Sequence, residues 1–205
     1  MRLLSYNMAK RPAAWADVFA SGADVAMLQE IANPNGIEHP IRVDGEPWQN
    51  QVVHHEHVWR NAVAALRDDV QIRWFKPHIA EVIPARGEPL IVMSLYAMWQ
   101  KPNAATGSSW IYADASAHRL ISDLSAFIGS VRGHRIIAAG DLNIFHGYGD
   151  KGSPYWTDTI ATATHQLDYV FASESIADRI SVRALNGIEE WGKSDHARVV
   201  VEVGE

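Results

Sequence analysis

The chain has 205 residues, 47% hydrophobic and 20% charged, which is enough for one globular domain with a sizeable core, expected to span residues 1–205. This composition excludes a disordered or fibrous protein. The formal net charge of -6 argues against binding a polyanion such as nucleic acid through the overall charge of the protein. The absence of cysteine excludes disulfides, thiolate metal sites and thiol nucleophiles.

The N-terminal segment, residues 1–7, has only a few apolar residues after one basic residue and no small-residue cleavage site, so we expect no signal peptide. No apolar run approaches the roughly 20 residues that a membrane span needs. We therefore expect a soluble, cytoplasmic protein without a membrane span, and nothing in the sequence indicates an obligate protein partner.

Short apolar runs bounded by turn residues predict about eight buried strands. In chain order they are Leu3–Tyr6, Asp24–Leu28, Asn61–Leu66, Leu90–Leu95, Arg135–Ala139, Leu167–Ala172, Ile180–Ala184 and Ala197–Val203. Helical spacing predicts helices over Pro12–Ala20 and Ala115–Val131, and Pro, Gly and Asn predict surface loops over 33–47, 101–109 and 147–155. Strands interleaved with helices indicate a layered α/β or α+β domain.

Polar residues interrupt the chain where several predicted strands end. These residues are Asn7, Glu30, Tyr96, Asp141 and Asn143. Ligands of open α/β sheets bind at the carboxyl ends of the strands. Asp168 and the pair Asp195-His196 precede their strands instead, and they reach the same edge if those strands run antiparallel to the earlier ones. The pattern therefore predicts one convergent polar site.

The residue types of this predicted site suit a hard cation. Carboxylate and amide oxygens favour Mg²⁺ or Mn²⁺, and the absence of a compact histidine set argues against zinc. A histidine and a further aspartate supply what in-line hydrolysis of a phosphoester requires, a positioned water and stabilisation of charge on the phosphoryl oxygens.

Five short motifs occur in order: Ser5-Tyr6-Asn7, Leu28-Gln29-Glu30, Gly140-Asp141-Leu142-Asn143, Leu167-Asp168-Tyr169 and Ser194-Asp195-His196. Together they resemble those of the endonuclease/exonuclease/phosphatase superfamily, which includes deoxyribonuclease I, abasic-site endonucleases, sphingomyelinases and inositol polyphosphate 5-phosphatases. The resemblance covers essentially the whole chain. It implies a four-layer α/β sandwich, with two packed mixed β-sheets flanked by helices, and divalent-metal-dependent phosphoester hydrolysis.

The resemblance also implies a metal site. Glu30 would be the principal metal ligand, with Asn7 and Asp195 nearby to complete or orient the site. Each residue has an alternative interpretation. Glu30 would otherwise begin a helix after its strand, whereas the other two would be hydrogen-bonding scaffold without direct contact to the metal.

The remaining roles implied by the resemblance are catalytic. Asp141 would position or deprotonate the attacking water, Asn143 would hold that water and a phosphate oxygen, and His196, oriented by Asp168, would stabilise charge on the phosphoryl group. Tyr96 matches a strand-end position that is Tyr in the abasic-site endonucleases and His in many phosphatases. The alternatives are an ordinary turn for the first two residues and structural side chains for the others.

Further residues are candidates for contacting the substrate. Lys10 and Arg11 follow Asn7 and would touch a flanking phosphate, with plain surface solvation as the alternative. The segment after the Asp141 motif offers stacking and hydrogen-bonding groups, and one more histidine precedes Asp168. These candidates are His146, Tyr148, Lys151, Tyr155, Trp156 and His165. The run from His54 to His57 is interpreted as a solvated loop.

Two departures from the family pattern weigh against DNA-repair specificity. The connection from Asp141 to Asp168 is short for this family, and Tyr96 is followed by Ala97-Met98-Trp99 without the Asn of the abasic-site enzymes. The leading prediction is a nuclease acting on DNA or RNA. The net charge and the short connection favour an alternative, a phosphatase or phosphodiesterase for a small phosphoester such as a nucleotide, sugar phosphate or lipid headgroup. A non-catalytic binding protein is disfavoured because every core motif residue is present.

Overall fold

The computed structural model describes residues 1–32, 34, 37–44, 61–97, 113–130, 133–143 and 167–204, and these residues contain two five-stranded sheets. The first sheet has the order β3-β2-β1-β10-β9, with β1 at Arg2–Asn7, β2 at Val25–Gln29, β3 at Asn61–Ala65, β9 at Ile180–Leu185 and β10 at Arg198–Val203. The second has the order β4-β5-β6-β7-β8, with β4 at Gln71–Lys76, β5 at Ile79–Ile83, β6 at Leu90–Tyr96, β7 at Arg135–Asp141 and β8 at Asp168–Ala172.

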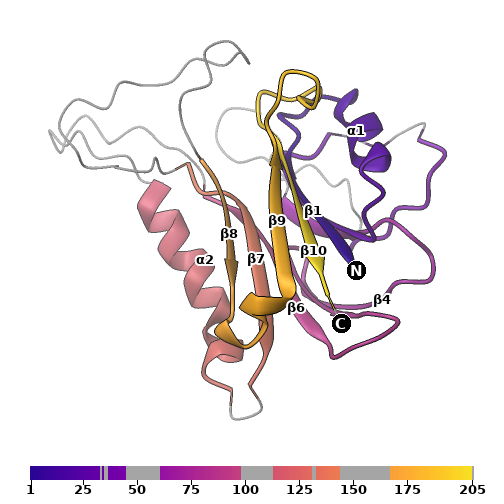
Figure 1. Ribbon diagram of the computed structural model, residues 1–205. Helices are drawn as coiled ribbons and strands as arrows, with labels where there is room; N and C mark the ends of the chain where they lie inside the picture. The colour runs from indigo at the N-terminus through magenta and orange to yellow at the C-terminus, as the bar shows by residue number, and fades with distance from the viewer. Residues whose placement is uncertain are drawn as a thin grey trace, which may run out of the picture.

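The two sheets share one pattern of strand pairing. Each contains a central parallel pair, β1 with β2 and β6 with β7, and the other strands are antiparallel to their neighbours. As a result, the ends of β1, β2, β6 and β7 and the beginnings of β3, β8 and β10 lie at the same end of their sheets. We call this the site end. Figure 1 shows the N-terminus at the opposite end.

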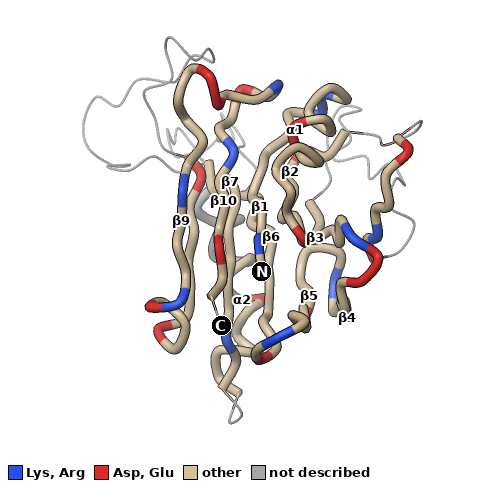
Figure 2. The backbone as a smooth tube through the Cα atoms, turned by 45° about the vertical axis from the view of Figure 1, so that its right-hand side comes forward, with Lys and Arg blue, Asp and Glu red and all other residues tan. Residues whose placement is uncertain are grey.

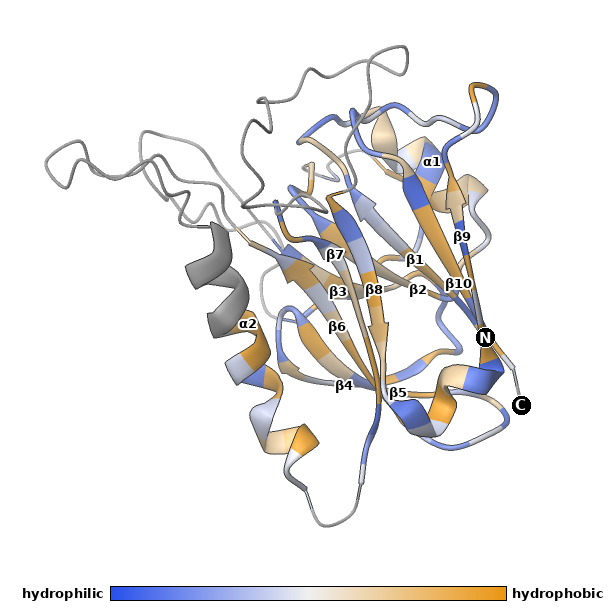
Figure 3. Ribbon diagram, turned by 60° about the vertical axis from the view of Figure 1, so that its left-hand side comes forward, coloured by the Kyte–Doolittle hydropathy of each residue, from blue (hydrophilic) through white to orange (hydrophobic). Residues whose placement is uncertain are grey.

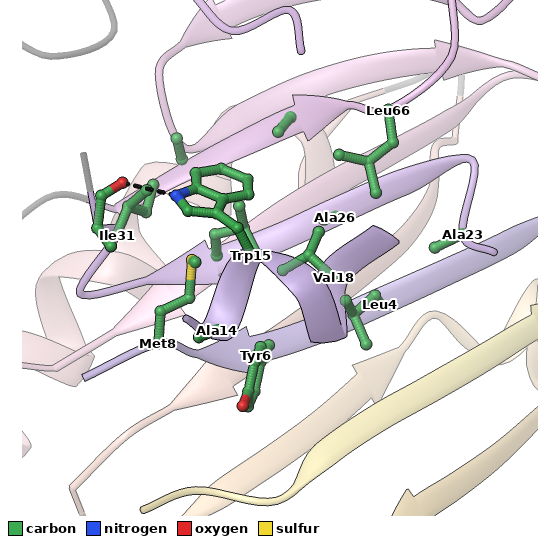
Figure 4. Packing of buried hydrophobic residues seen from close by; sticks show 14 of the residues in the cluster. Leu4, Tyr6, Met8, Ala14, Trp15, Val18, Ala23, Ala26, Ile31 and Leu66 are labelled. Atoms are coloured by element: carbon green, nitrogen blue, oxygen red, sulfur yellow. Dashed lines mark hydrogen bonds between the residues drawn. The ribbon is translucent and has the colours of Figure 1, made fainter. Parts of the chain in front are cut away.

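Strand alternation divides the apolar side chains of the first sheet between two faces. Leu4, Tyr6 and Leu28 face helix α1 (Ala14–Ala20), where they pack with Trp15 and Val18 in one cluster (Figure 4). Trp15 satisfies its buried indole N–H by donating to the carbonyl of Ala32 at 3.0 Å. Burial of this cluster holds α1 against the outer face of the sheet.

The inner faces of the two sheets form the middle of the core. Leu3, Val25 and Met27 of the first sheet share a buried cluster with Val92 and Ile137 of the second. On the outer face of the second sheet, the alternate residues Ile91, Met93 and Leu95 pack against Leu120 and Leu124 of helix α2 (Ala113–Ile128). Figures 1 and 3 show the helices on opposite sides of the paired sheets. The predicted four-layer sandwich is confirmed.

The predicted strands and helices are present with small shifts at their ends, and the structure adds elements that the sequence pattern missed. The helix expected over Pro12–Ala20 begins at Ala14, the helix expected over Ala115–Val131 spans Ala113–Ile128, and a short 3-10 helix, η2, covers Glu174–Arg179. The prediction of about eight strands is wrong by two, because β4 and β5 were not recognised. β4 is an edge strand with mostly exposed side chains, so its sequence lacks the continuous apolar run that marks a buried strand.

A polar contact fastens α2 to the hairpin of β4 and β5. Lys76 Nζ donates to Asp123 Oδ1 at 2.5 Å, and His78 Nε2 lies 3.3 Å from Asp123 Oδ2. Burial would raise the pKa of Asp123, but these hydrogen bonds outweigh burial and hold the pKa below its ordinary value.

The charged residues as a whole are interspersed along the described backbone (Figure 2). None of the described helices is long and apolar enough to cross a membrane.

Candidate active site

Two polar rows face each other at the site end. The strand registers place Gln29 directly opposite both Asn7 and Asn61 in the first sheet, and Asp141 directly opposite both Tyr96 and Asp168 in the second. These positions continue the inner faces of the sheets, where apolar residues pack farther from the site end. The polar site is therefore the end of the seam between the sheets.

Asn7 connects the two sheets. Its fully buried amide donates from Nδ2 to Asp141 Oδ2 at 3.0 Å and to Glu30 Oε1 at 3.5 Å. Its Oδ1 accepts from the backbone N–H of Ala9 at 2.9 Å. One side chain thus fixes the relative positions of two carboxylates that lie on different sheets.

Glu30 lies just beyond β2 and does not begin a helix, so that alternative interpretation is wrong. The hydroxyl of Tyr96 donates to Glu30 Oε1 at 3.1 Å, and Lys10 Nζ lies 3.7 Å from Oε2. Burial raises the pKa of Tyr96 well above its ordinary value, and the charges of Glu30 and Asp141 raise it further. The phenol therefore stays protonated and acts as a hydrogen-bond donor.

Asp141 ends β7 and is almost fully buried. Asn143 donates to it twice, from the backbone N–H to Oδ1 at 2.7 Å and from Nδ2 to Oδ2 at 2.9 Å, and also donates to the Ala97 carbonyl at 2.8 Å. The bond from the Asn143 backbone to the Asp141 side chain is ordinary local turn chemistry, and the Asp141 carboxylate also meets Asn7 of the facing sheet. Burial is the main cause that raises the pKa of Asp141, against the opposing effect of His196.

His196 lies between two aspartates. Its Nδ1 is 2.8 Å from Asp168 Oδ2, and its Nε2 is 3.9 Å from Asp141 Oδ2. Burial would lower the pKa of His196, but the charge of Asp168 and the hydrogen bond with it outweigh burial and raise the pKa above its ordinary value. The ring is thus oriented through one nitrogen while the other faces Asp141.

The turn before β10 joins this arrangement through Ser194, which is buried. Ser194 Oγ donates to the carbonyl of Asn7 at 2.6 Å and lies 3.2 Å from Asp195 Oδ1. Arg11 NH2 lies 3.8 Å from Asp195 Oδ2, and Arg11 NH1 donates to the carbonyl of Lys193 at 3.1 Å. Both basic candidates after Asn7 therefore pair with carboxylates of the site.

The backbone around the site is strained. All four non-glycine residues with positive φ in the described part of the chain lie here: Ala9 (48°), Lys10 (58°), Glu30 (45°) and Asn143 (51°). Such conformations cost about 1–2 kcal/mol each and persist where surrounding contacts hold them. Their clustering is typical of a functional site.

The oxygen donors that converge here fit a hard divalent cation. No group of three His, Asp or Glu side chains in the described segments is arranged to hold a metal ion. Two carboxylates, Glu30 and Asp141, nevertheless approach the same nitrogen of Asn7 from opposite sheets. Mg²⁺ typically takes one or two protein carboxylates and completes its shell with water and substrate phosphate. As placed, Asn7 turns its amide nitrogen toward the carboxylates, and Asp195 pairs with Arg11.

The structure brings together all eight residues with predicted catalytic or metal-binding roles. The predicted substrate contacts His146, Tyr148 and His165 lie outside the described residues, as do Lys151, Tyr155, Trp156 and the run from His54 to His57. Sequence reasoning missed Gln29 as an interior residue of the site, although its motif was noted. It also missed Asn61, a polar residue at the beginning of an antiparallel strand, which is the signal that identified Asp168.

A cavity of about 410 Å³ lies at the other end of the sandwich. It is lined in part by Met1, Leu90, Arg135 and Val203, which stand at the beginnings of β1, β6 and β7 or at the end of β10. None of the predicted site residues that the structure describes lines this cavity. The chemistry that the sequence predicts is therefore concentrated at the site end.

Two facing mixed sheets between helices, with carboxylates, amides and a histidine gathered at one end of the seam, define a class of α/β-sandwich phosphoesterases. The model of the endonuclease/exonuclease/phosphatase family matches residues 4–196, and the chain belongs to this family. Members of this family are phosphoester hydrolases, so the chain belongs to a family of enzymes. No curated protein matches the chain.

Solved structures share the fold at low sequence identity. The endonuclease domain of TRAS1, a telomere-specific non-LTR retrotransposon, is 17% identical, with 98% of this chain and 97% of that chain covered and a TM-score of 0.62. An AP endonuclease from Archaeoglobus fulgidus is 13% identical, with 99% of both chains covered and a TM-score of 0.57. The human nocturnin catalytic domain is 15% identical, with 98% and 92% covered and a TM-score of 0.58.

Proposed function

We propose that this chain is a Mg²⁺- or Mn²⁺-dependent phosphodiesterase, a nuclease acting on DNA or RNA. The observation that carries the proposal is the position of Asp141, which is buried at the seam, bonded to Asn7 of the facing sheet and 3.9 Å from His196 Nε2. Two of the similar structures are named as endonucleases, which supports a nucleic-acid substrate.

The residues divide into two functional groups. Glu30 would hold the cation, with Asn7 and Asp195 completing or orienting its site. When bound, the cation supplies positive charge that polarises the scissile phosphate and offsets the nearby carboxylates. Tyr96 keeps Glu30 in place through its hydroxyl.

Asp141 acts on the attacking water. Because burial raises the pKa of its carboxyl, this group is a better proton acceptor than an exposed aspartate. Asn143 fixes both carboxylate oxygens and would hold the water. His196, oriented by Asp168, would donate to the phosphoryl oxygens as negative charge builds on them.

Cleavage assays test this proposal. Purified protein is incubated with supercoiled plasmid, single-stranded DNA and RNA in the presence of Mg²⁺, with and without a chelator. Glu30→Gln and His196→Ala should each lower the rate by about 100-fold or more. Glu81→Gln and His134→Ala, which change the same residue types elsewhere in the fold, should leave it unchanged. Cleavage that survives both site variants or ignores the chelator would refute the proposal.

A second candidate, hydrolysis of a small phosphoester, is favoured by the charge distribution. Lys10 and Arg11 both face carboxylates of the site, at 3.7 Å from Glu30 and 3.8 Å from Asp195, and the chain carries a net charge of -6. Both facts reduce the positive charge available to grip a long polyanion. A phosphate-release screen over nucleotides, sugar phosphates and lipid headgroups decides between the candidates, since activity there with none on polynucleotides would select the second.

A further inference from the structure

A hydrogen-bonded group on the far side of the first sheet connects α1 with the turn before β10. The fully buried Tyr6 donates from its hydroxyl to Asp17 Oδ2 at 3.1 Å and accepts from the backbone N–H of Ser194 at 3.0 Å. The backbone N–H of Lys193 donates to the same Asp17 oxygen at 2.5 Å. Figure 4 shows the Tyr6 hydroxyl pointing away from the labelled apolar side chains. We call this group the Tyr6-Asp17 clasp.

Ser194 connects the clasp to the active site. Its hydroxyl donates to the carbonyl of Asn7 at 2.6 Å, and the backbone N–H of His196 donates to the same hydroxyl at 3.3 Å. Trp191 Nε1 donates to the Ser194 carbonyl at 3.1 Å. Ser194, two positions before His196, is therefore hydrogen-bonded through its backbone N–H, its backbone carbonyl and its side chain.

Gly192 shows how closely the turn lies against the clasp. A Cβ atom at this position would lie 2.6 Å from both the Tyr6 hydroxyl and Asp17 Oδ2. Its φ lies outside the positive range that favours glycine, so available space is the reason for a residue without a side chain. The polar atoms of the clasp fill the place that any side chain would need.

We infer that Tyr6 and Asp17 are positioning residues that hold the turn 192–196 so that His196 meets Asp168 and the Asp141 carboxylate. The inference rests on the proposed phosphodiesterase function. Neither side chain reaches the reacting groups in its own right, since the connection runs through Ser194. A displacement of about 1 Å in a catalytic group can cost about 100-fold in rate. The clasp should therefore affect turnover and leave substrate binding largely unchanged.

Kinetics of four single variants and one double variant test the clasp. Tyr6→Phe and Asp17→Ala should lower kcat by about 10- to 100-fold with KM within about twofold, and Gly192→Ala should do the same by steric displacement. Asp17→Asn keeps an oxygen that accepts from both partners, so it should retain kcat within about threefold of the wild-type value. The double variant Tyr6→Phe/Asp17→Ala should have a kcat no lower than that of the less active single variant, because the two residues act as one unit.

The matched control is Ser21→Ala. It removes another buried hydroxyl, which bonds Val18 and Ala23 at the end of α1 away from the site. This variant should keep kcat within about twofold, whatever it does to the melting temperature. An unchanged kcat in folded Tyr6→Phe and Asp17→Ala, or an equal loss in Ser21→Ala, would overturn the inference.

A second readout separates this inference from the proposed function. If the wild type cleaves no phosphodiester, the proposed function fails, and amide hydrogen exchange then tests the clasp. Tyr6→Phe should speed exchange at Ser194 by about 10-fold, and Asp17→Ala should do the same at Lys193, since each amide loses its acceptor. Exchange rates equal to wild type at both amides would overturn the clasp.

Discussion

Gly140 is the position at which one added methyl group should damage both stability and activity. It precedes Asp141 in β7, has φ of +147°, and lies directly opposite Leu95 of β6. A Cβ atom there would lie 2.0 Å from the Leu95 carbonyl oxygen and 2.7 Å from Gln29 Nε2. The first contact is with the backbone of the neighbouring strand, which cannot move without separating β6 from β7.

Two costs add in Gly140→Ala. Overpacking in a well-packed core costs about 1–3 kcal/mol, and a strained backbone conformation costs about 1–3 kcal/mol more. We expect the free energy of unfolding to fall by about 2–6 kcal/mol. Gly133→Ala is the matched control, because Gly133 also has positive φ (63°) but nothing lies within 4 Å of its added Cβ. Its cost should be about 1–2 kcal/mol.

Urea denaturation of both variants measures the difference, which should equal the overpacking cost of about 1–3 kcal/mol. Because Leu95 and Gly140 each precede a residue of the site, folded Gly140→Ala should also lose phosphodiesterase activity, whereas Gly133→Ala should keep it. Equal stabilities for the two variants, with activity retained in Gly140→Ala, would refute the reasoning from close approach.

Three further predictions concern the core, the histidine and the α2 contact. Ile137→Ala, in the middle of the sandwich, should lower the free energy of unfolding, measured in urea, by about 2–5 kcal/mol. Ile121 on α2 is 59% exposed, so Ile121→Ala should lower it by less than about 1 kcal/mol. Similar losses in the two variants would contradict the arrangement of the layers. Asp168→Asn should lower kcat by about 100-fold in protein that remains folded, because His196 loses the charged partner that orients it; a normal kcat would contradict that role. The lowered pKa of Asp123 means that its carboxylate stabilises the fold above pH of about 4 and that this stability is lost as the pH falls through the folded-state pKa. Unfolding of Asp123→Asn should therefore depend less on pH in that range, by about 0.5–1 kcal/mol, and identical pH dependence would contradict it.

The buried strands could be predicted from the sequence because their apolar runs are continuous. β6 and β7 are covered on both faces, so nearly every position in them is buried. β4 has only two partly buried side chains, Ile72 and Trp74, which pack against the central cluster, and its other four side chains are exposed. Edge strands of this kind are recognised only when their partner is known.

The candidate site was predictable to the extent that strand ends carry polar residues. The structure confirms that β8 and β10 run antiparallel to β7 and β1, which brings Asp168 and His196 to the site end. Asn61 carries the same signal as Asp168, but only the pairing of β3 with β2 shows that it lies opposite Gln29. The Tyr6-Asp17 clasp could not be predicted, because Asp17 has the sequence pattern of an exposed helical residue.

The sequence by itself determined the family, the buried strands and the residue types of the site, because motifs and apolar runs are local. Tertiary structure alone decided which polar groups meet. Asn7 and Asp141 are 134 positions apart, yet they bond at 3.0 Å because two registers and the packing of one sheet on the other bring them together. Changing either register by one residue would turn the polar row to the outer face, since strand side chains alternate with a period of two.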